Sequence, residues 1–211
     1  MSRHACDSLI FDMDGTLWDA VDSYCHVWDY TINETGLSRG PVTRDELVGL
    51  MGQPLERIVE VIVPDVEGKA DFLRRLDANE DRLMPQLGGR LFPGVKETIE
   101  ALSRDYRLFM VSNCSPNGLH NFMEWAGLTD CFTDSLSHGE TGCGKDVNIR
   151  RLVDRYGLKQ PLYVGDTQSD ADVCRRAGVP IAWASYGFGR IERPDIVLDT
   201  FADLPSKIYK P

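Results

Sequence analysis

The chain has 211 residues, a formal net charge of −10, and ordinary fractions of hydrophobic (42%) and charged (27%) residues. This length suits one buried domain, or a core with a modest insertion. The acidic balance argues against nucleic acid or an anionic membrane as the main partner, because both attract basic surfaces. No segment approaches the roughly 20 apolar residues that a membrane helix needs.

The six cysteines show no Cys-x-x-Cys pair and no regular spacing. Disulfide frameworks and zinc sites depend on such spacing, so reduced thiols are expected. The first seven residues are polar, unlike a signal peptide. We therefore expect a cytoplasmic protein, a monomer or a weak homodimer, that has no nucleic-acid or membrane partner.

The first predicted element is a short buried strand, Leu9 to Phe11, which ends in carboxylates and Gly15. From Asp19 to about Met84 the pattern is helical, and Pro54 and Pro64 interrupt it. The first helix of this block has an apolar face with i, i+3, i+4, i+7 spacing: Val21, Tyr24, Cys25, Trp28 and Ile32. Thr43 is suited to capping a shorter second helix. The block therefore predicts a small helical insertion.

After Gly88-Gly89 the pattern changes to strands alternating with helices. Strands are predicted at 108–111, 162–164 and 180–183, and helices at 119–126 and 149–156. This alternation predicts an α/β fold: a Rossmann-like parallel sheet with helices on both faces. The core domain is expected to comprise residues 1–17 and 89–211, and the inserted helical cap domain residues 18–88.

Polar side chains follow the predicted strands, and Lys145 opens a helix. The polar residues that follow the strands are Asp12, Asp14, Ser112, Asn113, Asp166 and Asp170. Ligands of open parallel sheets bind at the carboxyl ends of the strands, so these groups should converge on one edge. One lysine does not offset four carboxylates. A hard divalent cation does, and an all-oxygen set with room for water and phosphate suits Mg²⁺.

This combination of groups fits phosphoryl transfer. A carboxylate can attack phosphorus and form an acyl-phosphate that water then hydrolyses. Because Asp12 and Asp14 are two residues apart just beyond a strand, they point to the same side. Asp14 could then protonate the leaving oxygen while Asp12 attacks. Lys145 and the Ser112 hydroxyl could neutralise and hold the phosphoryl oxygens.

Four segments, in order, resemble the motifs of the haloacid dehalogenase superfamily: Asp12-x-Asp14-Gly15-Thr16-Leu17, Ser112-Asn113, Lys145, and Gly165-Asp166-x-x-x-Asp170. The helical insertion lies where phosphoglycolate phosphatase and β-phosphoglucomutase carry a cap. The resemblance implies that Asp12 is the nucleophile and Asp14 the general acid/base. It implies that Asp12, the backbone oxygen of Asp14 and Asp166 hold Mg²⁺, with support from Asp170. Ser112, Asn113 and Lys145 would bind the substrate.

The expected function is hydrolysis of a small phosphate monoester, phosphoglycolate-like or sugar-phosphate-like, and the alternative is a phosphosugar mutase like β-phosphoglucomutase. A 2-haloacid dehalogenase is disfavoured because it normally lacks an acid at the Asp14 position. Lys145 is followed by Asp-Val-Asn, whereas close relatives of phosphoglycolate phosphatase often have Pro-x-Pro, so the substrate stays open. The segment 51–53 and Arg57 are the predicted specificity residues of the cap.

Overall fold

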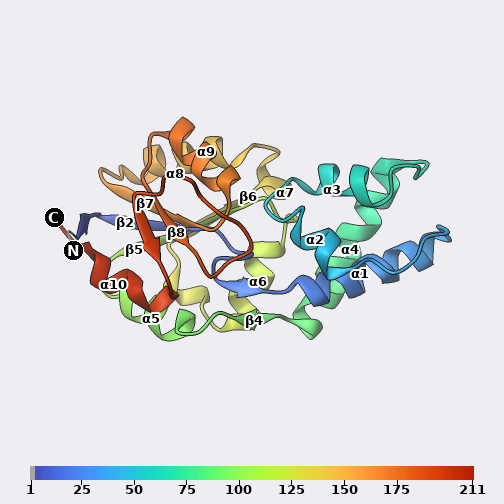
Figure 1. The fold of residues 1–211 in the computed structure, drawn as a ribbon, viewed down its shortest axis with the longest axis horizontal. Coiled ribbons are helices and arrows are strands. Elements are labelled where there is room, and N and C mark those ends of the chain that lie inside the picture. Colours follow the sequence, from blue (N-terminus) through green and yellow to red (C-terminus); the bar gives the residue numbers. More distant parts are fainter. Residues whose placement is uncertain (1–2) are drawn as a thin grey trace.

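A six-stranded parallel sheet forms the centre of the computed structural model, which describes residues 3–211 (Figure 1). Its strand order is β6-β5-β2-β7-β8-β9, and every neighbouring pair is parallel. In chain order the strands are β2 (Ser8–Phe11), β5 (Arg107–Ser112), β6 (Asp134–Ser137), β7 (Pro161–Gly165), β8 (Ile181–Ala184) and β9 (Ile196–Leu198). The predicted parallel α/β fold is confirmed.

Helices cover both faces of this sheet. Alternate residues of β2 therefore pack into two different hydrophobic clusters, one on each face. Leu9 and Phe11 belong to the cluster that holds α5 (Val95–Leu102) and α6 (Gly118–Ala126). Ile10 belongs to the cluster that holds α8 (Lys145–Tyr156) and α9 (Gln168–Ala177). A strand that is buried on both sides is a continuous apolar run, which is why this strand is recognisable in the sequence.

Shorter elements complete the core. They are α7 (His138–Thr141), α10 (Leu204–Lys207), the 3-10 turns η1 (Thr129–Cys131) and η2 (Phe201–Asp203), and the pair β1 (His4–Ala5) and β10 (Ile208–Tyr209). The last pair joins the two ends of the chain, which lie close together in Figure 1. All six cysteines are free thiols, as predicted.

The helical insertion lies between β3 (Trp18–Asp19) and β4 (Arg90–Leu91), which pair with each other in antiparallel fashion. Its helices are α1 (Val21–Thr35), α2 (Arg44–Val48), α3 (Leu55–Ile62) and α4 (Lys69–Leu87). They gather at the end of the molecule opposite to the termini (Figure 1). Thr43 caps α2, as expected: its hydroxyl accepts a hydrogen bond from the Glu46 amide.

Helices α1 and α4 pack against each other through aromatic side chains. The rings of Trp28 and Phe72 lie 5.9 Å apart, and both side chains are buried. Helix α4 carries many charges, yet every third or fourth residue, including Leu76, faces inward. Within residues 3–211, no helix is both long and apolar enough to cross a membrane.

This packing predicts that Phe72→Ala destabilises the protein strongly. Removal of a buried phenyl ring leaves a cavity, and we expect a loss of about 3–5 kcal/mol in the free energy of unfolding. Equilibrium urea unfolding followed by far-UV circular dichroism measures this loss. The matched control is Leu73→Ala, at the half-buried neighbouring position, which should cost less than half as much. Equal losses would contradict the described packing.

Candidate active site

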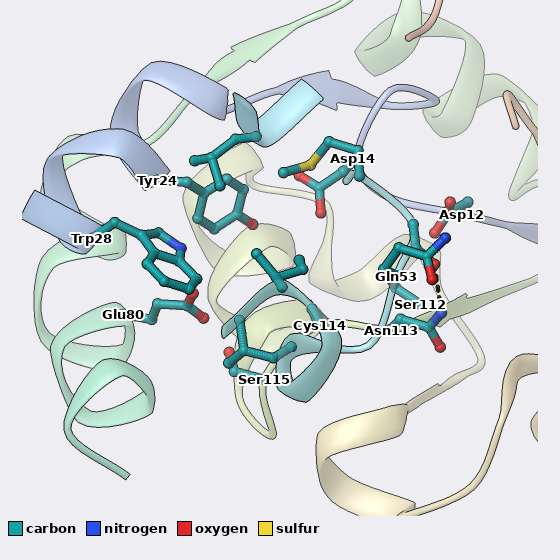
Figure 2. Close-up of a pocket in the computed structure, with 15 residues that line it drawn as sticks. Asp12, Asp14, Tyr24, Trp28, Gln53, Glu80, Ser112, Asn113, Cys114 and Ser115 are labelled. Atoms are coloured by element: carbon teal, nitrogen blue, oxygen red, sulfur yellow. Dashed lines mark hydrogen bonds between the residues drawn. The ribbon is translucent and has the colours of Figure 1, made fainter. Parts of the chain in front are cut away.

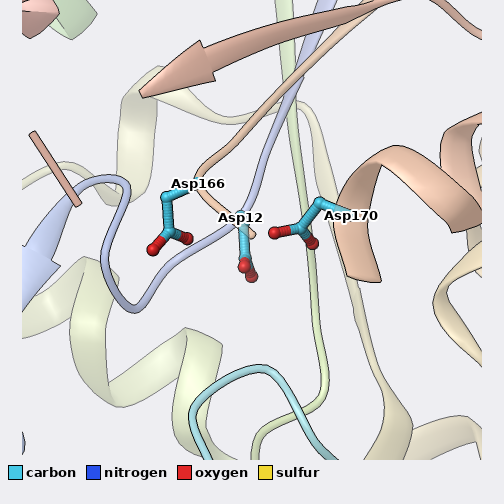
Figure 3. Close-up of side chains that lie close together, drawn as sticks. All are labelled: Asp12, Asp166 and Asp170. Carbon is cyan, nitrogen blue, oxygen red and sulfur yellow. The ribbon is translucent and has the colours of Figure 1, made fainter. Parts of the chain in front are cut away.

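Three carboxylates meet at the carboxyl edge of the sheet (Figure 3). Asp12 follows β2, Asp166 follows β7, and Asp170 lies in the first turn of α9. Each offers an oxygen, and these oxygens lie within 4.8 Å of one another. Strands β2 and β7 are neighbours paired in register, so their next residues emerge side by side. The predicted convergence of these three side chains is therefore observed.

Lys145 lies between two of these carboxylates. Its Nζ atom is 2.7 Å from Asp12 Oδ2 and 2.7 Å from Asp170 Oδ1, and the residue is only 3% exposed. Burial alone would lower the pKa of Lys145, but the two carboxylates outweigh this effect and raise it. Lys145 is therefore positively charged, and its ammonium group forms ion pairs with Asp12 and Asp170 in this structure.

The three carboxylates differ in how well they are compensated. Burial raises the pKa of Asp12 to about 6, although Lys145 counteracts the rise. Burial, with the charges of Asp170 and Asp12, raises the pKa of Asp166 well above its usual value. For Asp170 burial acts in the same direction, but Lys145 and Thr167 outweigh it and lower the pKa. The unbalanced negative charge therefore lies on Asp12 and Asp166.

Asp166 and Asp170 are oriented by neighbours that the sequence analysis did not single out. The Phe188 amide donates a hydrogen bond to Asp166 Oδ2 at 2.8 Å. The Thr167 hydroxyl and amide donate to Asp170 Oδ2 at 2.7 and 3.0 Å. Because Lys145 takes its other oxygen, Asp170 has no idle acceptor and is suited to support rather than direct ligation.

A cation fits beside Asp12 and Asp166. Asp12 Oδ1 is buried and lacks a hydrogen-bond partner among the described residues. A buried unpaired carboxylate oxygen is costly unless a cation or donor meets it. Oxygen donors without nitrogen or sulfur suit Mg²⁺. The donor set therefore matches the predicted ion.

Asp14 points away from the carboxylate cluster, into the neighbouring pocket (Figure 2). The Trp18 indole N–H donates a hydrogen bond to Asp14 Oδ1 at 2.9 Å, and the nearby Tyr24 hydroxyl also favours the ionised form of Asp14. Burial, with the adjacent charge of Asp12, raises the pKa of Asp14 to about 7. Since its side chain does not join the cluster, only its backbone oxygen remains as a predicted ligand.

The pocket lies between the sheet edge and the inserted helices (Figure 2). Ser112 ends β5 and Asn113 follows it, and both line the pocket together with Asp12 and Asp14. The Asn113 amide also donates a hydrogen bond to the Gly52 carbonyl at 2.7 Å, which ties the core to the insertion. Nine residues of the insertion line the pocket, too: Tyr24, Trp28, Leu47, Leu55, Ile58, Glu80 and the segment 51–53.

The structure places only some of the predicted specificity residues in the pocket. Met51, Gly52 and Gln53 line the pocket, as expected. Arg57 is exposed, pairs with Glu60 at 2.9 Å and is not among the described residues that line the pocket, so its role in specificity stays a prediction. Sequence reasoning missed Glu80, which seemed to be one more charge of a polar helix. The available signal was its position four residues after Leu76, on the buried face of α4.

Comparisons with known proteins agree with this geometry. The family model described as haloacid dehalogenase-like hydrolase matches residues 9–184. A phosphoglycolate phosphatase of Aliivibrio fischeri is 28% identical, over 92% of this chain and 92% of the relative. A phosphoglycolate phosphatase of Agrobacterium fabrum is 27% identical, over 99% of this chain and 95% of the relative.

Solved structures show the same fold. A predicted phosphoglycolate phosphatase from Haemophilus somnus superposes with a TM-score of 0.83 at 23% identity, over 95% of this chain and 97% of that one. CbbY from Rhodobacter sphaeroides, in complex with xylulose 1,5-bisphosphate, superposes with a TM-score of 0.80 at 17% identity. The match covers 97% of this chain and 100% of the CbbY chain. The resemblance stated from the four motifs is confirmed, and so is the enzyme class, a phosphatase-type hydrolase. The chain belongs to the haloacid dehalogenase-like hydrolase family.

Proposed function

We propose that this protein is a Mg²⁺-dependent phosphatase that hydrolyses small phosphate monoesters through an aspartyl-phosphate on Asp12. The observation that carries the proposal is the state of the Asp12 carboxylate. One oxygen is fixed by Lys145, the other lacks a hydrogen-bond partner within residues 3–211, and the residue faces a pocket. The full-length similarity to phosphoglycolate phosphatases supports phosphate esters as the substrate class.

The side chains divide the reaction between them. A carboxylate oxygen of Asp12 attacks phosphorus, and the bond from phosphorus to the ester oxygen breaks. Asp14, held by Trp18, gives its proton to the departing alcohol and can take one from the water that later attacks the aspartyl-phosphate. Ser112, Asn113 and Lys145 hold the phosphoryl oxygens.

The metal is assigned to Asp12, Asp166 and the backbone oxygen of Asp14. When bound, Mg²⁺ offsets the carboxylate charge and neutralises the phosphoryl oxygens. Asp170 positions Lys145 through its hydrogen bond of 2.7 Å. Lys145 thereby keeps Asp12 oriented, which is its first role before any phosphate binds.

We treat residues 18–88 as a cap domain and 1–17 with 89–211 as the core. The paired β3 and β4 then form the hinge between them. Asn117 and Gly52 provide contacts across the boundary: Asn117 Nδ2 donates to Asp81 at 2.6 Å, and Gly52 accepts from Asn113. Such a lid can exclude bulk water and select the leaving group.

The pocket favours hydrolysis over the mutase alternative. A phosphosugar mutase must hold a second phosphate on the cap side. Among the described residues that line the pocket there is no Lys, Arg or His to neutralise it. Water is the expected acceptor of the phosphoryl group, and a small phosphorylated metabolite is the expected partner.

The metal assignment predicts that EDTA abolishes hydrolysis of p-nitrophenyl phosphate and that Mg²⁺ restores it. Asp166→Asn should raise the Mg²⁺ concentration needed for half-maximal rate at least tenfold, because it removes a ligand charge. Asp172→Asn, on the exposed face of α9, should leave it unchanged. Undiminished turnover in EDTA would contradict the assignment of Mg²⁺ to this site.

The acid role of Asp14 predicts a dependence on the leaving group. Asp14→Asn should lower kcat on alkyl phosphates by about 10²–10⁴-fold, the usual contribution of general acid catalysis. The loss with p-nitrophenyl phosphate should be far smaller, since nitrophenolate departs without a proton. Asp22→Asn, an exposed change of equal charge, is the control. Equal losses with both leaving groups would rule out this role.

Close backbone approach at Gly187 predicts a further effect on the metal site. A Cβ at Gly187 would overlap the Gly15 carbonyl and the Asp166 side chain. Gly187→Ala should therefore displace Asp166 and weaken Mg²⁺ activation at least tenfold. Gly40→Ala, where a Cβ meets open space, should behave like wild type. Unchanged Mg²⁺ dependence in Gly187→Ala would contradict the described packing.

A further inference from the structure

A buried carboxyl group lies at the far end of the active-site pocket. Glu80 of α4 is 7% exposed and lines the same pocket as Asp12 and Asp14. In Figure 2 it lies next to Trp28, on the opposite side of the pocket from Asp12. A phosphoryl group at Asp12 therefore directs the remainder of its ester toward Glu80.

The walls between these two ends are mostly apolar. They are formed by Trp28, Leu47, Met51, Leu55 and Ile58. Such walls take water away from the leaving group, so any polar atom on it needs a partner from the protein. The pocket is also small, with a cavity volume of about 50 Å³. A water needs about 10–15 Å³ by this measure, so the space suits a leaving group of only a few atoms.

No positive charge balances Glu80. The described residues that line the pocket include no Lys, Arg or His. Lys145 is held by Asp12 and Asp170, beyond the pocket lining. Among the described residues, the Ser115 hydroxyl is the group near Glu80 that lowers its pKa and so favours the ionised form. Glu80 is thus an acceptor that is open to a further donor.

The electrostatic surroundings of Glu80 are negative. Burial raises the pKa of Glu80 to about 8, and the charges of Asp77, Asp14 and Asp81 act in the same direction. A ligand ammonium or hydroxyl group would favour the ionised carboxylate. A ligand carboxylate would add one more negative charge, and the two groups could meet only by sharing a proton.

We propose that Glu80 is a specificity-determining residue that selects phosphate monoesters whose short leaving alcohol carries an amine or hydroxyl donor and rejects those that carry a carboxylate. This inference rests on the proposed phosphatase function and narrows its substrate class. Substrates of the phosphoglycolate type are then poor, although the relatives in sequence carry that name. Asp14 still protonates the ester oxygen, and Glu80 contacts only the distal end.

The test compares four esters of similar size: 2-aminoethyl phosphate, 2-hydroxyethyl phosphate, ethyl phosphate and 2-phosphoglycolate. Release of inorganic phosphate is measured with Mg²⁺ near pH 7, where Asp14 can still carry the proton that it gives to the leaving oxygen and where a bound donor favours the ionised form of Glu80. For the wild type, kcat/KM for the aminoethyl and hydroxyethyl esters should exceed that for phosphoglycolate at least tenfold. Ethyl phosphate, which lacks both donor and charge, should fall between them.

The matched variants are Glu80→Gln and Glu67→Gln, the second on the exposed surface of the same insertion. Glu80→Gln should reduce the preference for aminoethyl phosphate over phosphoglycolate at least tenfold, and change kcat/KM for ethyl phosphate less than threefold. Glu67→Gln should retain the wild-type preference. The comparison of the four esters uses only the wild-type protein, so it tests the role of Glu80 even where Glu80→Gln folds poorly.

The outcomes separate the two claims. If the wild type prefers phosphoglycolate, or if Glu80→Gln leaves the preference intact, this inference is overturned and the phosphatase assignment stands. If no ester, including p-nitrophenyl phosphate, releases phosphate, the proposed function is overturned and this inference with it.

Discussion

Electrostatic repulsion at the end of the central strands dominates the structure of this site. Asp12, Asp166 and Asp170 offer oxygens within 4.8 Å of one another, and Lys145 supplies the one buried positive charge among the described residues around them. At an effective dielectric constant of about 20, each such pair of charges repels by about 3–4 kcal/mol. The parallel sheet keeps them together because β2 and β7 are hydrogen-bonded neighbours. Stability is thereby given up at a cluster of carboxylates that could hold a metal ion.

The same fold separates two kinds of acidic chemistry. On one side of the chain after β2, Asp12 contacts Lys145 and faces the cluster. On the other side, Asp14 is held by Trp18 in an apolar pocket that also contains Glu80. Lys145 compensates part of the negative charge in the first environment, whereas no described basic side chain lines the second. We expect the first to govern attack on phosphorus and the second to govern which alcohol leaves.

Much of this arrangement was predictable from the sequence. Strands such as 162–164 are continuous apolar runs, and the polar residues that follow them meet at one edge, so the cluster could be foreseen. Strand β6 was missed because Leu136 is its sole apolar side chain, and β9 because its apolar run is only three residues long. The interior contacts of Glu80 and Tyr24 depend on how the insertion packs over the core, and periodicity carries no information about that contact. The substrate pocket therefore had to come from the structure.

The central claim is that Asp12 becomes phosphorylated, and trapping the phosphoenzyme tests it most directly. Turnover of p-nitrophenyl phosphate with Mg²⁺ is quenched in acid, the acyl-phosphate is reduced with borohydride, and the modified peptide is identified by mass spectrometry. The account predicts modification at Asp12 alone, and none in Asp12→Asn. Modification at another residue, or steady phosphate release by Asp12→Asn at the wild-type rate, would contradict it.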